Sequence, residues 1–167
     1  ETANFLYTFG KSTILLCTAT QPHLHKTDRP VRLPDNPDIV NITSVELKVF
    51  ERVCIEDKTQ SAMDHKQIAE LVQKQIEQEK STLVIVNTKG DACKVYEQCK
   101  RFKCEKAFLT TDLCPAHRLS ILDRLRDNLK PESRKLTLCV STQLIEAGVD
   151  VSFDCVIRAQ AGMDSII

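Results

Sequence analysis

The chain has 167 residues, of which 42% are hydrophobic and 5% are aromatic, and its 23 basic residues balance 23 acidic ones. This length and apolar content allow one domain with an ordinary buried core and a tail. The lack of excess charge argues against a protein that binds nucleic acid mainly through a basic surface, and the shortage of aromatic residues argues against binding mainly by base stacking.

The first part of the chain carries little regular pattern. Residues 12–18, STILLCT, form a short apolar run that favours a β-strand. Residues 21–43 contain four of the six prolines, which suppress regular structure and predict an extended linker. Partial alternation of apolar and polar residues over 45–55 predicts another strand.

From residue 61 onward, the sequence predicts alternating helices and strands. Residues 61–80 carry apolar side chains at helical spacing, and Ser61 with Asp64 resembles a capping box. Thr88 is expected to cap a second helix. Pro115 suits the first turn of a third helix, whose inner face would be formed by four leucines, Leu119, Leu122, Leu125 and Leu129. Short apolar runs predict strands at 82–86, 107–109, 136–140 and 153–157, with a short helix at 143–147.

This alternation predicts an α/β fold. Short strands separated by helices are typical of βαβ units, and continuously apolar strands are typical of a parallel sheet that is covered on both faces. No CxxC pair occurs among the eight cysteines, so we expect buried reduced thiols and no metal site. No apolar run approaches the ~18 residues of a membrane span, and no signal peptide is visible. We therefore expect a cytoplasmic protein that does not enter a membrane.

The most informative segment is residues 138–150, LCVSTQLIEAGVD. A buried strand ends in two hydroxyl residues, Ser141 and Thr142, and hydroxyls beside free backbone amides suit a phosphate. Gly148 can end the short helix in a left-handed conformation, which leaves Asp150 able to accept hydrogen bonds from a ribose. A plain helix cap, a glycine turn and a surface aspartate would produce the same spacing, so spacing alone leaves both interpretations open.

This segment resembles motif V of superfamily-two helicases, a Thr-x₅-Gly-x-Asp pattern formed here by Thr142, Gly148 and Asp150. Thr18, Ala19 and Thr20 resemble motif III, residues 83–88 resemble motif IV, and residues 110–118 resemble the region around motif IVa. All four stand in the order of the superfamily. The resemblance implies a RecA-like sheet with helices on both faces.

Three stretches resemble one family more closely, the CRISPR-associated helicase–nuclease of type I interference systems: ILLCTATQPHL, STQLIEAGVDVSFDCVIRA and AGMDSII. The resemblance implies that residues 1–44 are the tail of a first RecA-like domain plus a linker, and that residues 45–167 are a second RecA-like domain that stops before motif VI. It implies a parent enzyme that uses ATP and Mg to move along single-stranded DNA, unwinds and degrades foreign DNA, and acts with a CRISPR RNA-guided surveillance complex.

The resemblance also implies roles for individual residues. Motif III, Thr18, Ala19 and Thr20, would couple the ATP state to DNA, and Gly148 and Asp150 would face ATP. Nucleic acid would be contacted by six residues, Asn87, Thr88, Thr110, Arg118, Ser141 and Thr142. Arg118 could equally cap the loop before it.

Two departures from the superfamily pattern favour DNA over RNA. Many RNA helicases carry Asp directly after the motif V threonine and Arg directly before its glycine. Gln143 and Ala147 occupy these positions here.

Several parts of such an enzyme are missing from the sequence. It contains no GxxxxGK phosphate loop, no acidic DExx motif and no histidine–aspartate nuclease cluster, and the motif VI arginines would lie beyond residue 167. We expect no complete catalytic set and no ATPase activity from the chain alone.

Three other interpretations remain open: another superfamily-two DNA or RNA helicase, a non-catalytic module that binds nucleic acid or a partner, and a flavodoxin-like signalling domain. The lack of an acidic cluster after the early strands argues against the last of these.

Overall fold

The computed structural model describes residues 2–16, 24–33, 39–40, 53–146 and 150–161. The chain divides into two compact units, residues 1–56 with residue 167, and residues 57–166. The domain boundary predicted between residues 44 and 45 lies outside the described residues. No described helix has the length and apolar character needed to cross a membrane.

The N-terminal unit contains a helix that the sequence analysis did not predict, α1 (Thr2–Phe9), and a short 3₁₀ turn, η1 (Leu24–Lys26). The Asn4 side chain joins α1 to the segment after η1, since its Nδ2 donates to the Pro30 carbonyl and its Oδ1 accepts from the Arg32 amide, both at 2.9 Å.

Neither strand expected in this part of the chain is present in its described residues. Residues 12–16 of the first and residues 53–55 of the second have no strand structure, and the remaining residues of both lie outside the described ranges.

The C-terminal unit is built on a four-stranded parallel sheet with the order β2-β3-β1-β4. All four strands fall where the sequence predicted strands: β1 (Thr82–Ile85), β2 (Glu105–Leu109), β3 (Thr137–Ser141) and β4 (Cys155–Arg158). β1 and β3 are buried along their whole length, as their continuous apolar sequences predict.

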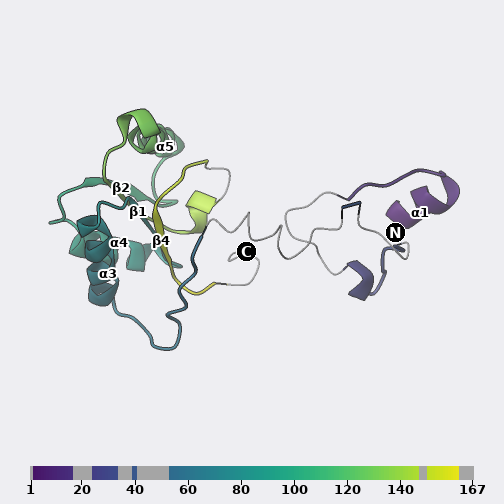
Figure 1. The fold of residues 1–167 in the computed structure, drawn as a ribbon, viewed down its shortest axis with the longest axis horizontal. Coiled ribbons are helices and arrows are strands. Elements are labelled where there is room, and N and C mark those ends of the chain that lie inside the picture. The colour runs from purple at the N-terminus through teal and green to yellow at the C-terminus, as the bar shows by residue number, and fades with distance from the viewer. Residues whose placement is uncertain (1, 17–23, 34–38, 41–52, 147–149, 162–167) are drawn as a thin grey trace. The chain divides into compact units, whose positions relative to one another are not determined.

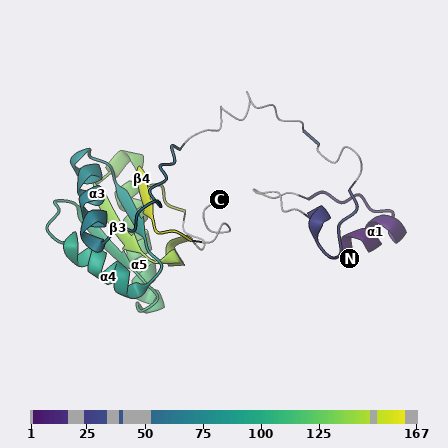
Figure 2. The same ribbon diagram turned by 90° about the horizontal axis from the view of Figure 1, so that it is seen from below.

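Helices cover both faces of this sheet (Figure 1). α3 (His65–Glu77) and α4 (Lys89–Gln98) pack on one face, around Val84 and Val140. α5 (Pro115–Leu129) and the 3₁₀ turn η3 (Gln143–Glu146) pack on the other. Figure 2 shows α3 and α4 lying together beside β3 and β4.

The topology explains this division of the helices. The chain runs from β1 past β3 to β2 through α4, then returns to β3 through α5. Crossovers of one hand that run in opposite directions place their helices on opposite faces of the sheet. The predicted parallel sheet with two covered faces is therefore confirmed.

The start of α3 differs from the prediction. Asp64, not Ser61, is the N-cap, and its Oδ1 accepts from the amides of Lys66 at 2.9 Å and Gln67 at 2.8 Å. The Gln67 side chain accepts from the Asp64 amide in return, which completes the capping box. The helix begins where these otherwise unpaired amides find a carboxylate.

The inner face of α5 also differs from the prediction, because Leu119 is 60% exposed. Leu125 is buried and Ile121 and Leu122 pack beside it. A residue repeated every three positions drifts around a helix of about 3.6 residues per turn, so Leu119 and Leu125 cannot share one face. The Pro115 start of α5 is as predicted.

The described cysteines are free thiols in different surroundings. Cys99 and Cys139 are buried, whereas Cys54, Cys93 and Cys114 are exposed. Burial raises the pKa of Cys99 to about 11 and that of Cys139 to about 12, because a thiolate would lose its hydration there. The expectation of buried thiols therefore holds for Cys99 and Cys139 but not for the three exposed cysteines.

Candidate nucleic-acid interface

The four strands all end at one edge of the sheet, here called the carboxyl edge. Their register aligns Leu109, Ser141, Ile85 and Arg158 in one row along it. Ser141 lies in this row, and the segments that follow the row, with the start of α5, carry the other five residues predicted to contact nucleic acid, Asn87, Thr88, Thr110, Arg118 and Thr142. Open parallel sheets bind ligands just outside the carboxyl ends of their strands.

The two hydroxyl residues at the end of β3 lie in different surroundings. Ser141 is fully buried, and its Oγ lies 2.9 Å from the Leu109 carbonyl oxygen, so it helps to hold β3 against β2. Thr142 is 9% exposed, and its amide donates to the same Leu109 carbonyl at 3.4 Å. Within the described residues, no partner bonds to the Thr142 hydroxyl, so this hydroxyl can serve a ligand.

The segment after β1 is held by two side chains. Asn87 Nδ2 donates to the Gln160 carbonyl at 2.8 Å, which joins the segments after β1 and β4. Thr88 caps α4 as predicted, because its Oγ1 accepts from the Asp91 amide at 3.1 Å and donates to the Asp91 carboxylate at 2.6 Å. Hydrogen bonds from Thr88 and from His65 lower the pKa of Asp91 below its usual value.

The segment after β2 leads into α5. Thr110 is buried, and its carbonyl accepts from the Leu113 amide at 3.3 Å to form a turn. Asp112 in this turn forms an ion pair with Lys89 at the start of α4. Arg118 is partly buried, and its buried Nε has no hydrogen-bond partner in the part of the chain that the structure describes. An unsatisfied guanidinium nitrogen supports the interpretation of Arg118 as an anion contact.

Asp150 lies apart from this set. It is exposed and lines an open groove formed by the second half of α5 and the segment before β4. The groove includes Arg126, Lys130 and Phe153. The structure therefore separates Asp150 from Thr142, although both belong to the predicted motif V.

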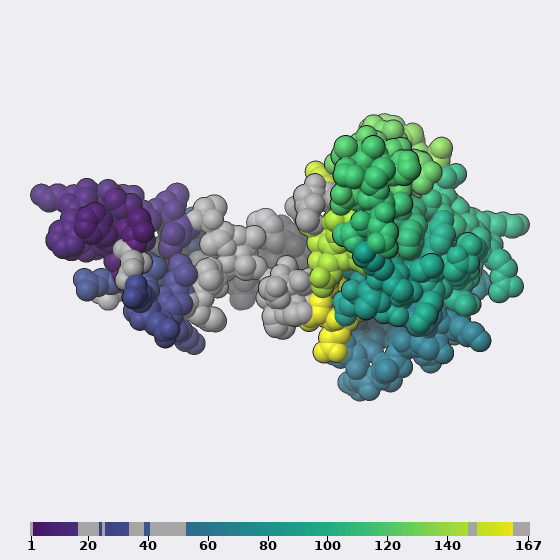
Figure 3. All heavy atoms as spheres, turned by 180° about the vertical axis from the view of Figure 1, so that it is seen from behind, coloured from purple at the N-terminus to yellow at the C-terminus, as the bar shows by residue number. Residues whose placement is uncertain are grey.

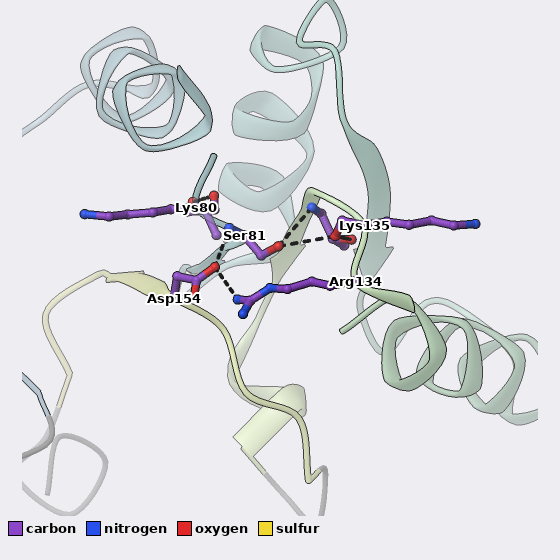
Figure 4. Close-up of polar contacts among 7 residues, drawn as sticks. Lys80, Ser81, Arg134, Lys135 and Asp154 are labelled. Carbon is purple, nitrogen blue, oxygen red and sulfur yellow. Dashed lines mark hydrogen bonds and ion pairs between the residues drawn. The ribbon is translucent and has the colours of Figure 1, made fainter. Parts of the chain in front are cut away.

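A polar network at the opposite, amino edge of the sheet anchors the segment that carries Asp150 (Figure 4). Asp154 accepts from the Ser81 amide at 2.9 Å and forms an ion pair with Arg134. The buried Ser81 hydroxyl accepts from the Thr137 amide at 3.1 Å. These contacts fix Asp154, four residues after Asp150, to the beginnings of β1 and β3.

Three features of these edges were not predicted from the sequence: the Ser81–Asp154 network, the Asn87–Gln160 bond and an ion pair between Glu146 and Arg158. Ser81 with Asp154 and Asn87 with Gln160 are each separated by 73 positions, so no local pattern connects them. They meet only because the strand order and register bring them together.

Some predicted residues fall outside the described ranges. These are Thr18, Ala19 and Thr20 of the predicted motif III, and Gly148 of the predicted motif V. Their roles stay predictions. Among the described residues, no group of three or more histidine, cysteine, aspartate or glutamate side chains is arranged to hold a metal ion.

Comparison with known proteins supplies the family. The sequence profile of the CRISPR-associated nuclease/helicase Cas3, C-terminal, matches residues 78–167. Crystal structures of T. fusca Cas3 with AMPPNP and with ATP each match 65% of this chain with a TM-score of 0.56 at 19% identity, and the ADP form gives a TM-score of 0.52. No curated protein sequence matches the chain.

These matches confirm the predicted RecA-like α/β fold. The chain spans 13% of the length of the T. fusca Cas3 chain. The family profile covers more than half of this chain, and the chain therefore belongs to the C-terminal family of the CRISPR-associated nuclease/helicase Cas3.

Proposed function

We propose that this chain forms the second motor domain of an ATP-dependent single-stranded DNA translocase, and that its carboxyl edge binds the DNA strand. The observation that carries the proposal is the convergence of the predicted contacts there, from Asn87 to Thr142, on separate strand ends. Family membership supports the same function. Gln143 and Ala147, which depart from the RNA-helicase pattern, support DNA as the substrate.

The contacts would be local, because the chain has no net charge to attract DNA as a whole. The Thr142 hydroxyl would donate to a backbone phosphate. Arg118 would supply a charge-assisted bond through its unpartnered Nε. Asn87 and Thr88 would shape the neighbouring part of the surface, since both side chains are engaged in holding the segment after β1.

Nucleotide would meet a different part of the domain. Asp150 is exposed and could accept hydrogen bonds from a ribose, with Gly148 beside it in the sequence. Without a phosphate loop, the residues present suit only one side of an ATP and Mg site. The phosphates would be held by a first motor domain, and Thr18, Ala19 and Thr20 would belong to the coupling segment between nucleotide and DNA.

The wider roles follow from the family. We infer a parent protein in which this domain feeds single-stranded DNA to a nuclease domain and is recruited by a CRISPR RNA-guided surveillance complex. The family name, which includes nuclease and helicase, supports the first of these roles.

The test is a titration of a fluorescent single-stranded oligonucleotide with this chain and two matched variants. Thr142→Val removes a hydroxyl at the carboxyl edge, and Thr82→Val removes one from a buried threonine at the amino edge. We expect Thr142→Val to weaken binding by about 1.5–3 kcal/mol, the contribution of a hydrogen bond to a charged group. Thr82→Val should leave the affinity unchanged.

If the two variants bind the oligonucleotide with equal affinity, the carboxyl edge does not bind DNA through Thr142. The same preparations should show no ATP turnover, because the phosphate loop is absent. A chain that binds DNA but adds no ATPase activity when combined with a phosphate-loop domain would favour the second candidate, a non-catalytic binding module.

A further inference from the structure

Among the ion pairs between described residues, the one that joins Glu146 to Arg158 is the least exposed. Glu146 ends η3 and is 30% exposed, and Arg158 ends β4 and is 17% exposed. In every other ion pair between described residues, both side chains are at least 31% exposed. Figure 3 shows the yellow segment that contains β4 at the surface of this unit.

The strand register explains why these two residues meet. Arg158 pairs with Ile85, and neighbouring residues of a parallel register point to the same face of the sheet. Ile85 packs in one apolar cluster with Ile145 of η3. The Arg158 side chain therefore rises from the face that η3 covers, where Glu146 follows Ile145.

The pair does not satisfy the guanidinium of Arg158. Its Nη1 bonds to Glu146, but Nε and Nη2 are buried and have no hydrogen-bond partner among the described residues. A half-buried ion pair loses hydration, and unsatisfied nitrogens add to that cost, so an apolar pair would stabilise the fold at least as well. The pair is therefore better explained by the position in which it holds η3 than by a contribution to the stability of the fold.

The position of η3 affects Thr142, the residue directly before it in the chain. The Thr142 carbonyl accepts from the Ile145 amide at 3.4 Å, so η3 and Thr142 are joined by a long hydrogen bond that holds little by itself. A charged contact at the other end of η3, from Glu146 to the edge strand, fixes the turn against the sheet. An unfixed η3 would let the Thr142 side chain leave its position at the end of β3.

We propose that Glu146 and Arg158 are positioning residues that hold η3, and through it the Thr142 hydroxyl, in the orientation that binds a DNA phosphate. This inference rests on the proposed function. It adds two residues that do not themselves touch DNA but on which the contact by Thr142 depends.

The experiment uses this chain with Glu146→Gln, Arg158→Gln and the charge-exchanged double variant that combines Glu146→Arg with Arg158→Glu. Asp123→Asn is the matched control, since it removes an exposed ion pair with Arg126 on α5. Two quantities are measured: the affinity for a single-stranded oligonucleotide and amide hydrogen exchange over residues 143–146. Each single variant should lose about tenfold in affinity and exchange about tenfold faster in that segment.

The charge-exchanged variant should recover both quantities, and the control should match the original chain. Arg158→Lys keeps the charge opposite Glu146, so its DNA affinity and exchange rate should stay within about twofold of the original chain. This variant keeps the inference testable if the charge-exchanged variant does not fold. Single variants that behave like the control, or recovery by neither the exchange nor Arg158→Lys, would overturn the inference. An original chain without DNA affinity overturns the proposed function instead, while hydrogen exchange still reports whether the pair holds η3.

Discussion

His65 Nε2 lies 2.9 Å from Asp91 Oδ1 and so joins the first turn of α3 to the first turn of α4. Thr88 holds the other oxygen of the same carboxylate. These contacts favour ionised Asp91, and they lower its pKa.

We therefore predict that Thr88→Ala raises the pKa of Asp91 toward its usual value and destabilises the domain by about 1 kcal/mol, the typical contribution of an N-cap. Because the folded-state pKa lies below the unfolded value, the stabilisation is present above the usual aspartate pKa of 3.8 and is lost as the pH falls through the lowered folded value. NMR titration and urea unfolding measure both effects. Thr59→Ala is the control, and an Asp91 pKa that moved equally in the two variants would refute the assignment.

Glu79 is expected to limit stability. It takes a left-handed conformation with φ 57° after α3, where its amide donates to the Ile76 carbonyl at 2.9 Å and the Lys80 amide donates to the Gln75 carbonyl at 3.0 Å. Glycine is the usual residue in this C-terminal motif, because a side chain is unfavourable there. Glu79→Gly should raise the free energy of unfolding by about 0.5–1 kcal/mol. Glu77→Gly, inside α3, should lower it, and stabilisation by both or by neither would contradict the prediction.

The cysteines should differ in reactivity. At pH 8, iodoacetamide should alkylate the exposed Cys54, Cys93 and Cys114, since the thiolate is the reactive form and these thiols are accessible. Cys99 and Cys139, with pKa values raised to about 11 and about 12, should react only after unfolding. Peptide mass spectrometry before and after addition of guanidinium separates the two groups. Rapid labelling of Cys139 in the folded protein would show that β3 is not buried.

Ser141 should stabilise the fold without binding DNA, whereas Thr142 should contact the DNA directly. Ser141→Ala leaves the buried Leu109 carbonyl with one hydrogen bond fewer, which should destabilise the fold by about 1–3 kcal/mol. DNA affinity, measured well below the melting temperature, should change less than in Thr142→Val. A stable Ser141→Ala variant with lost DNA affinity would reverse the two roles.

The sequence predicted the local features of the fold well. Continuous apolar runs located β1 and β3, and the position of Thr88 before its helix located a cap, because each depends on neighbouring residues only. It failed where the outcome depends on helical phase, as with Leu119.

The missed contacts of the candidate site have a different cause. The Ser81–Asp154 bond and the Glu146–Arg158 pair depend on the strand order β2-β3-β1-β4, which no segment encodes by itself. The separation of Asp150 from Thr142 was missed as well, because Thr142 follows β3 at the carboxyl edge whereas Asp150 lines the groove beside α5. Motif spacing places both residues in one motif but not at one place in the structure.

The central claim is that single-stranded DNA binds along the carboxyl edge, and NMR titration of the ¹⁵N-labelled chain with a short oligonucleotide tests it most directly. We predict that amide signals shift around Asn87, Thr110 and Thr142, on three separate strand ends that meet at this edge. The amides of Ser81 and Thr137, at the amino edge, should stay unchanged. Shifts that gather at the amino edge or on the outer surfaces of the helices, with none at the three strand ends, would contradict the account.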